Sequence, residues 1–98
     1  MRLRYTRLAL ADLDSILDYI ALHSPQGANR VFTRIQAVIG LLLTHPRVGV
    51  QTDDEVIRRI TTTPYPYLVF YEISGDEIII HAVRHAARNP SDMPGAGN

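Results

Sequence analysis

The stretch of sequence that decides the fold is VIRRITTTPYPYLVFYEISGDEIIIHAVRH, residues 56–85. It contains three runs rich in β-branched, aliphatic and aromatic residues, which are typical of strands. Proline, glycine and aspartate separate these runs at 63–66 and 74–76, where they indicate turns. We therefore predict a meander of antiparallel strands over 56–62, 67–73 and 77–85.

Two helices are predicted before the meander, because apolar residues recur there at spacings of three and four. Thr6 is placed to cap the first helix, and His23 closes it. Ser24-Pro25 starts the second helix, since serine is a good N-cap and proline is tolerated at the first helical position. His45-Pro46 ends the second helix. The residues expected in the core are Leu13, Ile16, Leu17, Ile20, Phe32, Ile35, Ile39 and Leu42, with Val69 and Tyr71, or the residues that alternate with them, beneath.

A short strand is predicted at the start of the chain, because Leu3 and Tyr5 alternate with arginines over residues 2–6. The predicted order of elements is then β-α-α-β-β-β. Helices segregated from hairpin-linked strands indicate an α+β fold, with a helical hairpin packed on an antiparallel sheet. We expect a single domain over 1–89 and a flexible tail over 90–98, because the tail is rich in proline and glycine.

The composition narrows the class of protein. The 98 residues allow one domain, and the absence of cysteine excludes disulfide scaffolds, thiol nucleophiles and cysteine–zinc sites. No apolar run reaches the roughly 18 residues that a membrane span needs, and Met1-Arg2-Leu3-Arg4 precedes no signal-peptide core. We therefore expect a small cytosolic protein with no membrane partner. The net charge of zero argues against non-specific coating of nucleic acid.

No metal or cofactor site is predicted. His81 and His85 are four residues apart on a predicted strand, so they share a face but lie about 13 Å apart. Ligands of one metal ion sit at about 2 Å from it, which excludes joint coordination by this pair. The sequence also lacks the Gly-x-Ser-x-Gly elbow and the glycine-rich phosphate loop.

All ten basic residues are arginine, so lysine chemistry is excluded and paired contacts with carboxylates or phosphates are favoured. Two arginines lie on the first meander strand, and the other basic candidates lie at the end of the last strand. One interpretation is a single anion-binding surface formed by Arg58, Arg59, Arg84, His85 and Arg88. The alternative is a solvated sheet face with ordinary salt bridges, for example to Glu72 or Asp53.

Three apolar side chains lie off the two helical stripes: Tyr19, Leu22 and Leu41. Single exposed apolar residues are common in soluble proteins. Three on one small hairpin also fit an interaction surface. Both interpretations stay open at this stage.

Several motifs occur in an order found in a known family. The first helix carries Ala9-x-x-Asp12-Leu13-x-x-Ile16-x-x-Tyr19-Ile20, and the second leads from Pro25-x-x-Ala28 to Pro46-x-x-Gly49. The strands carry Ile57-Arg58-x-Ile60, Tyr67-Leu68-Val69-Phe70-Tyr71, Ile78-Ile79-Ile80 and Val83-Arg84-His85-x-x-Arg88. Over roughly residues 3–89 the chain resembles the RelE/ParE superfamily of bacterial type II toxins. The closing His-x-x-Arg and the Tyr-Leu-Val-Phe-Tyr strand resemble the ParE branch.

The resemblance implies a microbial-ribonuclease-like α+β fold and a role as the toxin of a toxin–antitoxin pair. It implies a ParD-like antitoxin with a ribbon-helix-helix DNA-binding part and a C-terminal segment that wraps the toxin, so that DNA is contacted only through the antitoxin. ParE-type toxins act on DNA gyrase and have no established catalytic chemistry, whereas RelE-type toxins cut mRNA on the ribosome. Toxicity is assigned to the five basic candidates, and antitoxin binding to Tyr19, Leu22 and Leu41.

The residues favour gyrase over mRNA as the target. RelE-type nucleases place several basic residues, often lysines, on the first meander strand and an aromatic or basic residue in a C-terminal helix. This chain has no lysine and no aromatic residue after Tyr71, and Pro90 disfavours such a helix. Ribonuclease catalysis needs a positioned acid and base, for which His85 and Glu72 are the available pair. An mRNA interferase and a non-toxic interaction module of the same fold stay open as alternatives.

Overall fold

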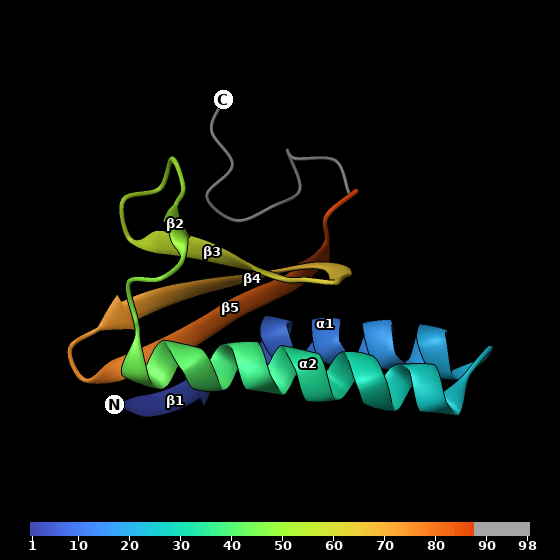
Figure 1. Ribbon diagram of the computed structural model, residues 1–98. Helices are drawn as coiled ribbons and strands as arrows, with labels where there is room; N and C mark the ends of the chain where they lie inside the picture. Colours follow the sequence, from blue (N-terminus) through green and yellow to red (C-terminus); the bar gives the residue numbers. More distant parts are fainter. Residues whose placement is uncertain (88–98) are drawn as a thin grey trace.

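Two helices lie side by side against one face of a five-stranded sheet in the computed structural model, which describes residues 1–87 (Figure 1). The sheet order is β1-β5-β4-β3-β2. The helices are α1 (Arg7–Ala21) and α2 (Pro25–Thr44). The strands are β1 (Arg2–Tyr5), β2 (Val50–Gln51), β3 (Ile57–Thr62), β4 (Tyr65–Ser74) and β5 (Glu77–His85). The predicted α+β fold with a helical hairpin on a sheet is confirmed.

The sheet is mixed, whereas the sequence predicted an antiparallel one. Strands β3, β4 and β5 form the predicted antiparallel meander. Strand β1 instead pairs in parallel with β5, with Leu3 opposite Ile78, and the two-residue β2 adds a fifth strand beside β3. The turn residues between the strands predict the meander, because hairpin pairing is local in sequence. No local signal specifies a pairing between the two ends of the domain.

The helix boundaries follow the predicted caps. The Thr6 hydroxyl accepts a hydrogen bond from the Ala9 backbone N–H at 3.1 Å, and the Ser24 hydroxyl accepts one from Gly27 at 2.9 Å. Each hydroxyl satisfies a donor that the first turn of a helix leaves free. In the meander, Gly75 takes a φ of +60°, which lets Gly75-Asp76 close the β4–β5 hairpin as a two-residue turn. The turn before β4 is shorter than predicted, because β4 begins at Tyr65.

The core lies between the helical hairpin and the sheet. The predicted residues Leu13, Ile35, Ile39, Leu42, Val69 and Tyr71 are buried there, and Ile16, Leu17 and Ile20 pack against them half-buried. Phe32 was predicted to be buried and is 36% exposed, so that prediction is wrong. The buried stripe of α2 begins at Val31, and the next residue is rotated by about 100° around the helix. Phe32 therefore lies at the margin of the stripe.

A second, smaller cluster lies on the other face of the sheet. It consists of Ile57, Leu68, Phe70 and Ala82 and contains no helix residue. Successive side chains of a strand point to opposite faces, so the sheet has a helix-facing side and a second side, called here the outer face. This alternation decides where each basic residue of β3 and β5 points.

Candidate functional site

Arg58 is part of the internal framework. Its guanidinium Nη1 donates to the carbonyl of Gly49 at 2.8 Å and lies 3.4 Å from the carbonyl of Arg47. The same loop is held from below by Tyr71, whose hydroxyl donates to Pro46 O at 2.7 Å and accepts from Gly49 N–H at 2.9 Å. Burial raises the pKa of this tyrosine. Arg58 and Tyr71 together fix the chain between α2 and β2.

Gly49 is required by this arrangement. A Cβ added to Gly49 would stand 2.5 Å from the Tyr71 hydroxyl oxygen and 2.8 Å from the Arg59 carbonyl oxygen. Both distances are shorter than side-chain contacts allow, and the second neighbour is backbone. The close approach of the loop to the tyrosine therefore depends on a residue without a side chain.

Arg84 is also used inside the fold. Its Nε lies 3.3 Å from Asp12 Oδ2, and the two side chains are only 14% and 13% exposed. The same carboxylate oxygen accepts the Val83 backbone N–H at 3.0 Å. The Nε contact lacks hydrogen-bond geometry, so charge rather than a hydrogen bond joins Arg84 to Asp12. Beyond the end of β1, α1 thus takes the place of a neighbouring strand along β5.

Arg59 and His85 are the two candidates that remain exposed. Arg59 stands opposite Phe70 in the β3–β4 register, which places it on the outer face. His85 ends β5, where its ring meets the ring of Tyr67 edge to face at 5.4 Å between centroids. Its Nδ1 accepts the Ala87 backbone N–H at 3.0 Å. The fifth candidate, Arg88, lies outside the described residues.

The described basic candidates do not share one surface. Arg58 points to the helix-facing side. Arg59 and Arg84 stand opposite Phe70 and Leu68 on the outer face, but Arg84 is held against Asp12 of α1 and is mostly buried. Glu72, suggested as a salt-bridge partner for this group, pairs with His81 instead. Asp53 forms no ion pair with these arginines within residues 1–87.

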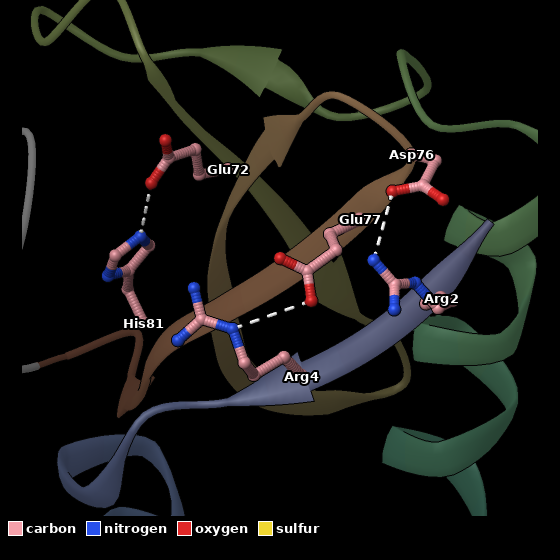
Figure 2. A network of polar contacts seen from close by, with 6 residues as sticks. All are labelled: Arg2, Arg4, Glu72, Asp76, Glu77 and His81. Carbon is pink, nitrogen blue, oxygen red and sulfur yellow. Dashed lines mark hydrogen bonds and ion pairs between the residues drawn. The ribbon is translucent and has the colours of Figure 1, made fainter.

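The outer face carries polar pairs that the sequence analysis did not foresee. His81 Nε2 lies 2.8 Å from Glu72 Oε1, and Arg4 Nε lies 3.6 Å from Glu77 Oε2. Figure 2 draws both pairs. A bulge places His81 here, because Phe70 stands opposite Ala82 and Tyr71 opposite Ile80, which leaves His81 as the extra residue. Strand alternation alone cannot predict such an irregularity.

The three off-stripe apolar residues are exposed as predicted, but they lie in two places. Tyr19 is 67% and Leu22 is 80% exposed, and both lie near the turn between the helices. The Tyr19 ring contacts the ring of His23 at 5.9 Å between centroids. Leu41, 41% exposed, lies 16 residues after Pro25, which is about 24 Å along the helix axis. Tyr19, Leu22 and His23 are called the tip patch below, and Leu41 is separate from it.

Comparison with known proteins identifies the family. The family model that describes the ParE toxin of the type II toxin–antitoxin system parDE matches residues 3–90. The chain belongs to this family. Toxin RelE2 of Caulobacter vibrioides is 34% identical over 84 residues, which cover 86% of this chain and 93% of that protein. The solved structure of the chromosomal ParDE TA system from P. aeruginosa matches with a TM-score of 0.75 and 28% identity. That match covers 87% of this chain and 95% of the other.

The family assignment settles the toxin–antitoxin class, while ParE and RelE names both occur among the similar proteins. Within residues 1–87 of this ParE-family toxin, no helix is long and apolar enough to cross a membrane. The same residues contain no group of three or more His, Asp or Glu side chains placed to hold a metal ion.

Proposed function

We propose that this ParE-family toxin inhibits DNA gyrase and is neutralised by a ParD-like antitoxin. The family model over residues 3–90 and the similarity to a ParDE structure support this assignment. On the proposed target, the toxin acts by binding and not by catalysis. Its growth inhibition then depends on exposed side chains that the fold itself does not use.

The single observation that favours binding over catalysis is the use of Arg58 and Arg84 inside the fold. A nuclease needs several basic groups around the scissile phosphate, together with an acid and a base. Here Arg58 binds loop carbonyls and Arg84 is paired with Asp12, so neither guanidinium is presented to a substrate. Arg59 remains as an exposed guanidinium suited to a carboxylate on a protein or a phosphate of DNA.

The test is gyrase supercoiling with purified toxin and two arginine variants. Arg59→Ala should raise the inhibitory concentration about thirtyfold, because an arginine at a binding hot spot contributes about 2 kcal/mol. Arg7→Ala is the matched control, since Arg7 is an exposed arginine on α1 that forms no ion pair within residues 1–87. Absence of inhibition by the wild-type toxin, at concentrations that arrest growth, would reject gyrase as the target.

The pair formed by Glu72 and His81 favours a second candidate, an mRNA interferase. A carboxylate 2.8 Å from an imidazole on the outer face is a pair of groups able to carry protons. If this activity exists, translating ribosomes with added toxin should accumulate cut mRNA, and His81→Ala should abolish the cuts. Cut mRNA together with unaffected supercoiling would replace the gyrase assignment with this one.

A further inference from the structure

One flank of α2 carries an open hollow of about 530 Å³ beside the connection between β3 and β4. Arg30, Arg34 and Ala37 line it from the helix, Pro64 lines it from the connection, and Tyr65 lines it from the start of β4. The two arginines are one helical turn apart, so their side chains emerge on the same flank. The hollow therefore has an apolar wall with two guanidinium groups beside it.

The positive charge of this flank is not neutralised by the fold. Arg30 and Arg34 form no ion pair within residues 1–87. Arg34 Nε donates to the Thr63 carbonyl at 2.8 Å, which holds its side chain across the hollow while its charge stays unpaired. A carboxylate that binds here would not have to displace an existing acidic partner, and it would relieve the repulsion between two like charges.

The same flank continues toward Leu41. Residues 30, 34, 37 and 41 follow spacings of four, three and four, so they form one stripe along α2. Because the side chain of Ala37 is small, the helix surface between Arg34 and Leu41 is recessed. Leu41 lies about 10 Å beyond Arg34 along the helix axis. A second open hollow, of about 400 Å³, lies beyond the end of α2 and is lined by His45, Pro46, Arg47 and Val48, so it is not purely apolar. Within α2 the flank is thus basic at Arg30 and Arg34 and apolar at Leu41.

We propose that this α2 flank binds an acidic, amphipathic segment of the antitoxin. Carboxylates of that segment lie opposite Arg30 and Arg34, and an apolar side chain lies opposite Leu41. A helical segment would carry the acidic and apolar residues about seven positions apart, and an extended segment about three apart. The inference rests on the proposed antitoxin partner and names the surface that receives it. The tip patch lies at the turn before α2 and is not part of this surface.

Charge and apolarity together select this occupant. A nucleic acid would satisfy the two arginines, but its phosphates would meet the exposed Leu41 further along the stripe. An apolar helix without acidic residues would leave two guanidinium groups covered and unpaired, which is costly. A segment that is acidic at one end and apolar at the other pairs its carboxylates with the two arginines and covers Leu41 with an apolar side chain.

The experiment measures binding of the toxin to the product of the neighbouring reading frame by calorimetry, at low and at raised salt. Arg30→Glu should weaken binding at least tenfold and reduce its dependence on salt. Leu41→Glu should weaken binding to a similar degree while the salt dependence remains. Arg7→Glu, the same change at an exposed arginine of α1, is the matched control and should bind like the wild type. Melting temperatures of all variants verify that the fold is intact.

Each outcome separates this inference from the proposed function. Failure of the wild-type toxin to bind the neighbouring protein would overturn the antitoxin assignment and this inference with it. Wild-type affinity in both Arg30→Glu and Leu41→Glu would overturn the flank and leave the antitoxin in place. Tight binding of a single-stranded oligonucleotide that is lost in Arg30→Glu would reassign the flank to nucleic acid. If Arg30→Glu lowers the melting temperature, Arg30→Gln provides the same comparison without a new charge.

Discussion

The contact between Asp12 and Arg84 gives the sharpest test of how the fold uses its arginines. Asp12→Ala removes the only carboxylate that faces Arg84 within residues 1–87 and also the acceptor of the Val83 N–H. An uncompensated buried charge costs about 3–5 kcal/mol, and an unsatisfied buried donor costs about 1–3 kcal/mol. Because Arg84 keeps 14% exposure and water reaches part of it, we expect a loss of about 3 kcal/mol.

Two further variants separate the charge from the hydrogen bond. Asp12→Asn keeps an oxygen for the Val83 N–H and removes only the charge, so it should cost less than Asp12→Ala. Arg84→Met keeps the aliphatic packing of the side chain and removes the buried cation. In the Arg84→Met background, Asp12→Ala should cost only the lost acceptor, about 1–2 kcal/mol. The difference between the two backgrounds measures the ion pair.

The assay is urea unfolding followed by far-ultraviolet circular dichroism, with the free energy of unfolding extrapolated to water. A domain of 98 residues has a total stability of about 5–15 kcal/mol, so a loss of 3 kcal/mol shifts the midpoint clearly. Equal costs of Asp12→Ala in the wild-type and Arg84→Met backgrounds would refute the ion pair. Supercoiling inhibition measured on folded Arg84→Met protein then tests whether Arg84 also takes part in target binding. Unchanged inhibition would assign the residue to the framework alone.

Three further predictions concern the core, the Tyr71 hydroxyl and the tip patch. Ile35→Ala should cost about 2–5 kcal/mol in urea unfolding, whereas Phe32→Ala, at an exposed position, should cost clearly less. Burial raises the pKa of Tyr71 above 10.0, so its share of stability is fully present below pH 10 and is lost as the pH rises through the folded-state pKa. Unfolding measured between pH 9 and 12 should therefore show a smaller decline in Tyr71→Phe than in the wild type. Tyr19→Asp and Leu22→Asp should leave the melting temperature unchanged, and calorimetry with the neighbouring protein tells whether the tip patch also contacts it.

The elements that the sequence predicted are those with local signals. Thr6 and Ser24 cap helices a few residues away, and Gly75 supplies the positive φ of its own turn. Nothing local links β1 to β5, since their paired residues are about 75 positions apart. The bulge that frees His81 to meet Glu72 is likewise a property of two strands and not of one. Long-range register therefore had to come from the structure.

The basic residues show the same division at the level of function. Arg58 and Arg59 are neighbours of identical chemistry, and no composition or charge argument distinguishes them. Strand alternation turns one toward the loop carbonyl of Gly49 and the other toward solvent, so only the second retains a guanidinium for a partner. Arg84 has its partner on α1, although Asp12 is 72 positions away in sequence.

The arginines of α2 lie outside the strand motifs, and no sequence pattern pointed to them. Arg30 and Arg34 nevertheless have no acidic partner within residues 1–87. In a chain whose cations are all arginine, the residue type cannot separate framework from recognition. Framework and recognition arginines are distinguished by whether the guanidinium already has a partner within the fold.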